Sequence, residues 1–240
     1  MALRENTLFG NIDKVKTAIM RIKEFEPIAL NINPAGYYVC TSGGKDSSVI
    51  QELCIMAGVR CEFVHQHTSV DHPETVYFIR KEQKRIVDLG YSFTIEIPRG
   101  LDGKQKTMWS GIYKKGLPTR RARWCCSDLK ESGGKGRYCI TGVRWAESFK
   151  RRQRGLHEEK TRKKEDRVVL NNDNDMRRRF SESCIPRQSF ILNPIVDWSD
   201  DDVWDFIKLQ NIPVNPLYSQ GFKRIGCIGC PLSSKGRKEK

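Results

Sequence analysis

Residues 37–48, which read YYVCTSGGKDSS, restrict the fold of this chain more than any other stretch. Residues 37–41 form a short apolar, β-prone run, which predicts a buried strand. Gly43 and Gly44 interrupt that run, and residues 47–57 then show the apolar spacing of a helix. A strand, a glycine turn and a helix in this order point free backbone N–H groups at an anion. The stretch therefore predicts an anion-binding turn within an α/β fold.

The side chains of this turn suggest what the anion is. Lys45 adds a positive charge, and Ser47 and Ser48 add hydroxyl donors. The Asp46 carboxylate would repel a bare phosphate, but it fits a site in which Mg²⁺ lies between the two. An ordinary strand-to-helix turn is the alternative interpretation, and a glycine pair alone does not exclude it. The spacing of the Walker A motif, Gly-x-x-x-x-Gly-Lys, is missing.

Strand-like and helix-like segments alternate along the rest of the chain. This rhythm predicts a parallel five-stranded sheet with helices on both faces, an α/β fold of the Rossmann-like kind. On such sheets ligands lie at the carboxyl ends of the strands. Besides the first strand and its helix, we expect strands at 59–68, 92–97, 137–144 and 190–196 and helices at 71–89 and 200–209.

The expected organisation is one nucleotide-binding domain with additions. Residues 1–35 are predicted to be a helical segment, because Ile12, Val15, Ile19 and Ile22 recur at helical spacing. The domain itself spans 36–232 and includes a highly charged insertion at about 150–187, which we expect to be a mobile excursion. Residues 233–240 form a basic tail.

The chain is strongly basic, with 43 Lys and Arg against 29 Asp and Glu and a net charge of +14. Such an excess favours polyanionic partners, nucleic acid or nucleotides, although a merely soluble basic surface is the alternative. The excess is concentrated at 99–137, 150–187 and 223–240. We expect a cytoplasmic protein, because no signal peptide or membrane-spanning run is present and nine cysteines suit a reducing compartment.

Two cysteine pairs stand out among the nine cysteines. Cys227 and Cys230 form a C-x-x-C motif, and Cys125 and Cys126 are adjacent. Together they supply four thiolates, which suits a 4Fe–4S cluster, and zinc on the same sulfurs is the alternative. Four unrelated small apolar residues are the third interpretation, which their Gly- and Arg-rich surroundings disfavour.

The remaining cysteines and two histidines are interpreted differently. Four cysteines lie in predicted regular elements and are expected in the core: Cys40, Cys54, Cys61 and Cys139. Cys184 lies in the charged insertion next to arginine, where a thiol would be nucleophilic, although a bystander role is favoured. His65 and His67 are expected on opposite faces of their strand, with packing or capping roles favoured over catalysis.

With these motifs in place, the chain resembles the phosphoadenylyl-sulfate and adenylyl-sulfate reductase family, in its iron–sulfur branch. That family is part of the PP-loop ATP pyrophosphatase superfamily, with an adenine-nucleotide alpha-hydrolase-like fold. Four blocks carry the resemblance in order: 42–48; Thr68 with 72–75; 141–148; and 193–227.

The resemblance implies functions for particular residues. A nucleotide would be bound by Ser42, Gly43, Gly44, Lys45, Asp46, Ser47, Ser48, Thr68, Gly142 and Arg144. Lys45, Asp46 and Arg144 would be catalytic, and Cys184 is a further catalytic candidate. A 4Fe–4S cluster would be held by Cys125, Cys126, Cys227 and Cys230. ATP and Mg²⁺ complete the expected set of cofactors.

Two departures from the reductase pattern shape the functional hypothesis. The reductases carry a catalytic cysteine near the C-terminus, whereas no cysteine follows Cys230 here, and the basic segment 150–187 is extra. We therefore expect ATP-dependent adenylylation of nucleic acid, tRNA or DNA, for sulfur insertion, with a cysteine desulfurase or another sulfur donor. The alternatives are a sulfonucleotide reductase that makes sulfite and a non-catalytic nucleotide- or nucleic-acid-binding module. The oligomeric state is open, and a homodimer is one option.

Overall fold

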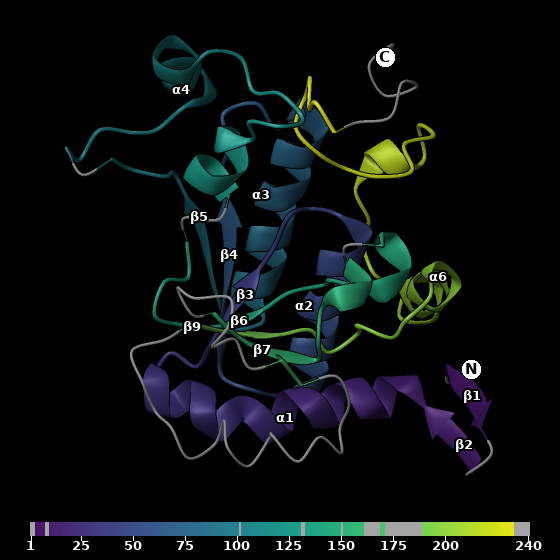
Figure 1. Cartoon of the computed structure of the whole chain (residues 1–240). Coiled ribbons are helices and arrows are strands. Elements are labelled where there is room, and N and C mark those ends of the chain that lie inside the picture. Colours follow the sequence, from purple (N-terminus) through teal and green to yellow (C-terminus); the bar gives the residue numbers. More distant parts are fainter. Residues whose placement is uncertain are drawn as a thin grey trace. The chain divides into compact units, whose positions relative to one another are not determined.

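The structure is a computed structural model that describes residues 3–7, 10–100, 102–130, 133–149, 151–160, 169–170 and 189–232. Its helices are α1 (Lys14–Ile32), α2 (Lys45–Ala57), α3 (Pro73–Asp88), α4 (Met108–Lys115) and α6 (Asp200–Leu209). Its strands are β1 (Arg4–Thr7), β2 (Gly10–Asp13), β3 (Tyr37–Cys40), β4 (Cys61–Gln66), β5 (Ser92–Glu96), β6 (Tyr138–Ile140), β7 (His157–Lys160), β8 (Val169–Leu170) and β9 (Ser189–Leu192) (Figure 1). Within these described residues no helix is both long and apolar enough to cross a membrane.

The main sheet is mostly parallel, as expected for an α/β fold, and has the strand order β5-β4-β3-β6-β9-β7-β8. Strand β6 pairs in parallel with β3 on one side and with β9 on the other. The expectation of five strands was wrong, because β7 and β8 extend the sheet in antiparallel fashion. Both come from the segment 150–187, which we had expected to be a mobile excursion throughout.

Pairing with β9 explains why part of a charged segment joins the sheet, although two consecutive polar side chains are buried there. His157 and Glu158 of β7 are fully buried, and their backbones pair with Leu192 and Ile191 of β9. Glu158 is compensated where it lies, since Arg154 Nε is 2.7 Å from its carboxylate. Local charge therefore gave a misleading signal, because distant groups also contact these side chains: His157 Nδ1 lies 2.5 Å from the Tyr138 hydroxyl, and Asn193 Nδ2 donates to Glu158 Oε1 at 3.4 Å.

The N-terminal expectation needs a correction as well. The first residues form the antiparallel pair β1–β2, and Ile12 lies in β2 with its side chain exposed. Helix α1 begins at Lys14 because the Asp13 carboxylate accepts hydrogen bonds from the backbone N–H groups of Val15 and Lys16. The buried face of α1 is Ala18, Arg21, Ile22, Phe25 and Ala29.

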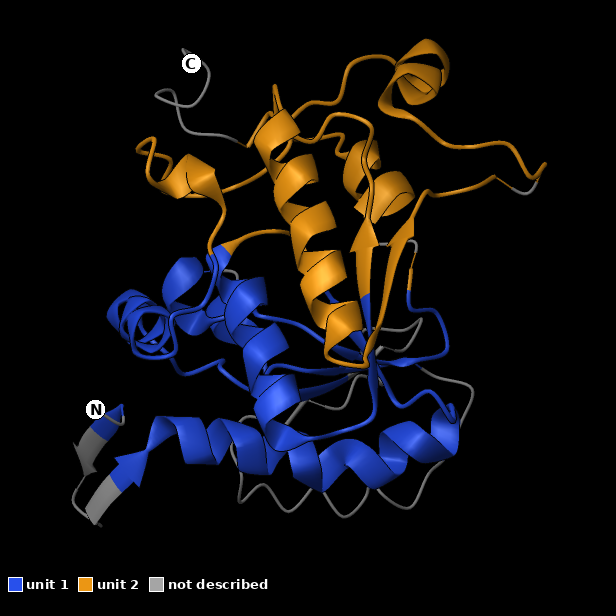
Figure 2. Ribbon diagram, turned by 180° about the vertical axis from the view of Figure 1, so that it is seen from behind, with its two compact units in different colours: residues 1–41, 45–63, 134–213 blue, residues 42–44, 64–133, 214–240 orange. Residues whose placement is uncertain are grey.

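Two compact units make up the chain, and Figure 2 shows them in blue and orange. Unit 1 comprises residues 1–41, 45–63 and 134–213, and unit 2 comprises residues 42–44, 64–133 and 214–240. The core of unit 1 contains an aromatic cluster, in which Phe25, Tyr138 and Phe190 surround the imidazole of His157. In unit 2 the buried Asn215 side chain donates to Thr75 Oγ1 of α3 at 2.9 Å.

Candidate nucleotide site and cysteine cluster

The turn before α2 requires glycine at one position. Gly43 has a φ of +74°, in the left-handed region, and a Cβ there would lie 3.0 Å from Thr75 Cγ2. Helix α2 begins at Lys45, two residues earlier than the apolar spacing suggested. Lys45 and Asp46 therefore occupy its first turn, where the free N–H groups of a helix gather. Ser47 and Ser48 follow within α2 and are buried.

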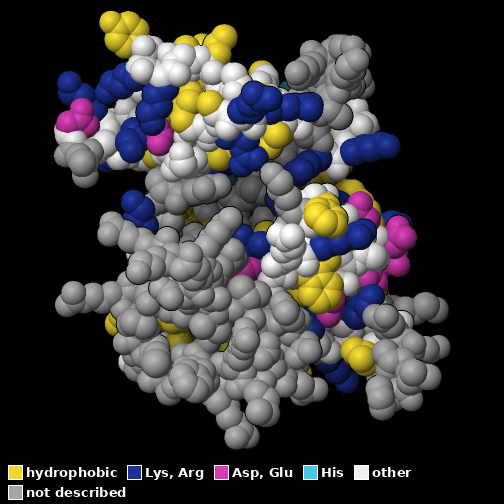
Figure 3. Space-filling model, in the orientation of Figure 1, with side chains coloured by type: hydrophobic (Ala, Val, Ile, Leu, Met, Phe, Trp, Pro, Cys, Tyr) yellow, Lys and Arg dark blue, Asp and Glu magenta, His cyan; other side chains and the backbone are white. Residues whose placement is uncertain are grey.

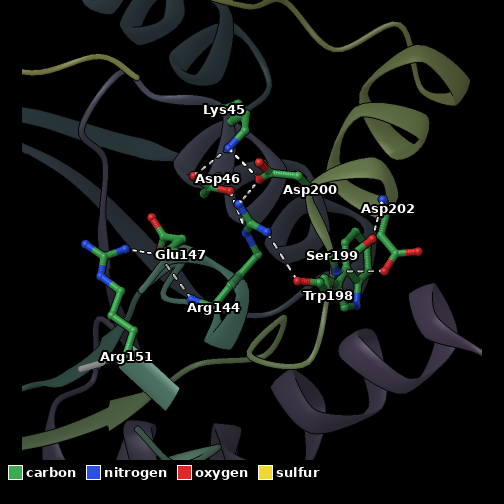
Figure 4. Close-up of polar contacts among 9 residues, drawn as sticks. All are labelled: Lys45, Asp46, Arg144, Glu147, Arg151, Trp198, Ser199, Asp200 and Asp202. Carbon is green, nitrogen blue, oxygen red and sulfur yellow. Dashed lines mark hydrogen bonds and ion pairs between the residues drawn. The ribbon is translucent and has the colours of Figure 1, made fainter. Parts of the chain in front are cut away.

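Four charged side chains of unit 1 converge beside this helix start (Figure 4). Arg144 Nε lies 2.7 Å from Asp46 Oδ1, and Arg144 Nη2 lies 2.5 Å from Asp200 Oδ1. Lys45 Nζ lies 3.4 Å from Asp46 Oδ2 and 3.1 Å from Asp200 Oδ1. Two cations thus alternate with two carboxylates in one cluster, which we call the charged quartet.

Arg144 is the buried centre of the charged quartet. Its side chain is fully buried, and Nη1 also donates to the Trp198 carbonyl oxygen at 3.2 Å. Its backbone N–H donates to Glu147, which is in turn paired with Arg151. The resemblance implied an arginine that reaches phosphate or sulfate. In this structure the guanidinium donates to two carboxylates, and its contact with a nucleotide stays a prediction.

Asp200 is the exposed member of the charged quartet, with 68 % of its side chain accessible to solvent. Partial burial tends to raise its pKa, but hydrogen bonds from Arg144 and Lys45 outweigh that effect and lower the pKa. The Asp200 carboxylate is therefore charged at neutral pH. Together with Asp46 it offers oxygen ligands of the kind that Mg²⁺ prefers.

Close packing and capping hold the quartet's two carboxylates. A Cβ on Gly142 would lie 2.9 Å from the backbone C and O of Asp46, so only glycine lets the loop after β6 approach α2 this closely. Ser199 caps α6 in a capping box with Asp202. Lys14 Nζ lies 2.7 Å from Asp202 Oδ2.

A second group of functional candidates lies within unit 2. The Cys125 thiol has a raised pKa, first because of burial and then because of the neighbouring Cys126 and Cys227 thiols. Cys227 also raises the pKa of Lys130, against the effect of burial. Three of the four cysteines expected to ligate a cluster are thus electrostatic neighbours.

The fourth cysteine stays close along the chain, because the Cys230 backbone N–H donates to the Cys227 carbonyl at 3.3 Å. Four thiolates from two chain segments would suit an iron–sulfur cluster or zinc, and this ligation stays a prediction. Of the cysteines expected in the core, Cys54, Cys61 and Cys139 are buried and Cys40 is half-buried. Cys184 lies outside the described residues.

Thr68 lies beside the cysteines. Its hydroxyl is 3.4 Å from Cys227 Sγ and donates to Asp71 Oδ1 at 2.8 Å. Its backbone N–H donates to Asp71 Oδ2, also at 2.8 Å. Ser42 and Gly44 are also part of unit 2. A Cβ on Gly44 would make only ordinary contacts, at 3.5 Å from Ser42 Oγ and from the Tyr218 hydroxyl.

Two residues of these sites were missed at the level of sequence. Asp200 was interpreted only as the first residue of a helix, and Asp71 only as the start of α3. The available signal for Asp200 was the run of three aspartates, 200–202, which exceeds what one helix start needs. Nothing local distinguished Asp71.

Helix α4 carries an exposed aromatic and basic surface. Trp109 and Tyr113, one helical turn apart, are 69 % and 91 % exposed. Lys115 Nζ lies 5.8 Å from the centre of the Trp124 ring. In Figure 3, Lys and Arg side chains gather among hydrophobic ones in the upper region, where Figure 1 places α4.

Comparisons with known proteins identify similar sequences. An uncharacterized protein of Methanocaldococcus jannaschii, MJ0973, is 31 % identical over 97 % of this chain and 53 % of its own length. Adenosine 5'-phosphosulfate reductase 2 of Bacillus subtilis is 25 % identical over 82 % of this chain and 72 % of its own. The first two curated relatives are longer proteins, of which the chain spans about half or less.

Solved structures show the same fold. Phosphoadenylyl-sulfate reductase from Candida auris superposes with a TM-score of 0.53 at 18 % identity, covering 85 % of this chain and 87 % of that one. FMN adenylyltransferase of Candida glabrata, in complex with FMN and an ATP analogue, has a TM-score of 0.54 at 16 % identity, with coverages of 90 % and 63 %. Residues 36–233 match the phosphoadenosine phosphosulfate reductase domain, and the chain therefore belongs to that family.

Proposed function

We propose that the chain is an adenylyl-transferring enzyme that binds ATP and Mg²⁺ at the turn 42–48 and activates an oxygen of a nucleic acid for replacement by sulfur. The observation that carries the proposal is the charged quartet. Asp46 and Asp200 are held as a pair by Lys45 and Arg144 at the start of α2. A site for phosphate alone has no use for two carboxylates, whereas a site for a magnesium–phosphate complex does.

Each member of the charged quartet has a distinct role in this scheme. Lys45 and the N–H groups at the start of α2 would bind the phosphates. Asp46 and Asp200 would hold Mg²⁺, which offsets the negative charge that develops on the leaving pyrophosphate. Arg144, which is fully buried, is a positioning residue that keeps the two carboxylates in place.

The proposed reaction has two steps. An oxygen of the substrate attacks the α-phosphorus of ATP, the bond from that phosphorus to the bridging oxygen breaks, and pyrophosphate leaves. Hydrosulfide, released by a thiol reductant from a persulfide on a donor protein such as a cysteine desulfurase, then attacks the activated atom. AMP leaves with the original oxygen, and the proton of the hydrosulfide passes to solvent.

The surface on α4 supports nucleic acid as the substrate. Trp109 and Tyr113 are exposed on a helix whose last turn is Lys114 and Lys115. Aromatic rings stack on unpaired bases, and lysine and arginine neutralise the phosphate backbone. A single-stranded region, as in tRNA loops or melted DNA, therefore fits this surface better than a small sulfonucleotide.

Cys125, Cys126, Cys227 and Cys230 would hold the 4Fe–4S cluster, and zinc is the alternative occupant. When bound, such a cluster supplies electrons or a site for sulfur transfer. Around it, the Thr68 hydroxyl oxygen lies 3.4 Å from Cys227 Sγ while its hydrogen is donated to Asp71, so Thr68 lies between one ligand sulfur and that carboxylate. A cytoplasmic location remains part of the proposal, and a homodimer remains one option for the assembly.

The second candidate is a sulfonucleotide reductase. The family match over residues 36–233 and the similarity to the Bacillus subtilis reductase favour it. Thiol-dependent reduction needs no magnesium–pyrophosphate site, however, so the two functions predict opposite behaviour of the two carboxylates.

The test compares both reactions on the anaerobically purified chain. With ATP, Mg²⁺ and single-stranded DNA or tRNA we expect pyrophosphate release, which Asp46→Asn and Asp200→Asn abolish. Asp201→Asn is the matched control, since Asp201 lies exposed in the same helical turn outside the quartet. Sulfite release from adenylyl sulfate and a thiol, unaffected by Asp200→Asn and without any ATP turnover, would establish the reductase instead.

A further inference from the structure

Two histidines and one carboxylate of unit 2 converge at the end of β4. His67 Nδ1 lies 3.4 Å from Asp71 Oδ2, and His65 Nε2 lies 4.0 Å from the same oxygen. One ligand atom from each of the three residues lies within 4.8 Å of the other two. The expectation that the histidines point to opposite faces was wrong, because residues i and i+2 of an extended segment share one face, and both rings lie near Asp71.

These distances fit one metal ion. Ligands about 2.1 Å from a tetrahedral metal are separated by about 3.4 Å, so small side-chain rotations bring all three atoms into a coordination sphere. Two imidazoles and one carboxylate form the set found in catalytic zinc sites and in non-haem iron(II) sites. Both kinds of site leave a position open for water or substrate.

The carboxylate is already oriented by neighbouring groups. The Thr68 backbone N–H donates to Asp71 Oδ2, and the Thr68 hydroxyl donates to Oδ1, each at 2.8 Å. Such hydrogen bonds to a ligating carboxylate are a regular feature of metal sites, because they fix its orientation and tune its basicity. Asp71 is also nearly buried, so its charge needs compensation where it lies.

A cavity gives the open position that such a metal needs. It has a volume of about 160 Å³ and is lined by both histidines, by aliphatic side chains such as Val76 and Ile95, and by Arg80. A water molecule occupies about 30 Å³ of liquid, so the cavity has room for water and a small ligand. The positive charge of Arg80 at this cavity favours an anionic ligand.

We propose that His65, His67 and Asp71 bind one divalent first-row transition-metal ion, with the open coordination position facing this cavity. The site is separate from the four cysteines, although Thr68 contacts both groups. It does not depend on the proposed adenylyl transfer. An ordinary ion pair between a protonated His67 and Asp71 is the competing explanation.

Cobalt(II) separates the two explanations, because its spectrum reports the ligand type. The full chain, freed of loosely bound metal with a chelator, is titrated with Co²⁺ under anaerobic conditions. Cys227→Ser is titrated in parallel to remove thiolate ligation. We expect one equivalent of Co²⁺ with visible d–d bands but without sulfur-to-metal charge transfer, and this equivalent persists in Cys227→Ser.

The variants then assign the ligands. His67→Gln and Asp71→Asn should each weaken this Co²⁺ binding by more than the 10- to 100-fold typical of a lost second-shell group. His72→Gln is the matched control, a histidine of similar exposure next to Asp71 that should bind as the wild type does. The proposal is overturned if the wild-type chain binds only thiolate-ligated Co²⁺, or if His67→Gln and His72→Gln bind equally well.

Discussion

Replacing Arg144 with methionine tests whether the charged quartet is an integral part of unit 1. Methionine keeps most of the side-chain length, so the main change is the loss of a fully buried charge. Three hydrogen bonds disappear, to Asp46, Asp200 and the Trp198 carbonyl. The Asp46 side chain, only 21 % exposed, is left with Lys45 at 3.4 Å as its remaining partner in the quartet.

The magnitude follows from the exposure of the partners. Removing one partner of a buried ion pair costs about 3–5 kcal/mol, because the other charge is left without compensation. The bond to Asp200 contributes little, since an exposed carboxylate is rehydrated by water. We therefore expect Arg144→Met to lower the free energy of unfolding by about 3 kcal/mol, the lower end of that range.

The assay is urea unfolding followed by far-ultraviolet circular dichroism, with the slope of the transition unchanged. Lys115→Met is the control, because it breaks the exposed pair with Asp128 and should cost less than about 1 kcal/mol. In the double variant Asp46→Asn with Arg144→Met, the loss should be at least about 1 kcal/mol smaller than the sum of the single losses. If the two stability losses add strictly, the pair is not coupled. A loss below about 1 kcal/mol for Arg144→Met would show that the quartet does not stabilise unit 1.

Three further perturbations test other parts of the structure. Burial lowers the pKa of His157 to about 4, so between about pH 6.5 and pH 4 only the unfolded chain gains this proton. The unfolding free energy should fall by about 2 kcal/mol from pH 7 to pH 5, and His157→Phe should remove that slope in urea titrations. Gly142→Ala should weaken ATP binding in calorimetry, because the new Cβ displaces the Asp46 backbone. Gly136→Ala is the control and should leave ATP binding unchanged, because a Cβ there meets open space, although its φ of +67° strains the backbone. Trp109→Ala with Tyr113→Ala should weaken binding of single-stranded DNA by about 1–3 kcal/mol per stacked base in fluorescence anisotropy, while binding of ATP stays unchanged.

Local signals in the sequence were enough for the elements whose ends depend on neighbouring residues. Helix α6 begins where Ser199 and Asp202 form a capping box, and both lie within four residues of each other. Strand β3 follows from a β-prone run, and the turn follows from a glycine at position 43, where the structure has a positive φ. Such features are readable because their energies arise within one turn of chain.

Other features were decided by the tertiary structure. Asp200 meets Lys45 and Arg144 only because α6 packs on α2, and no local pattern encodes that contact. Strand β7 lies in a charged segment that would be solvated alone, but pairing with β9 and the Arg154 contact make burial of Glu158 favourable. The residue composition of a segment predicts whether the isolated segment is exposed to water. Whether the segment is buried in the folded chain depends on which distant groups form hydrogen bonds or ion pairs with its polar atoms.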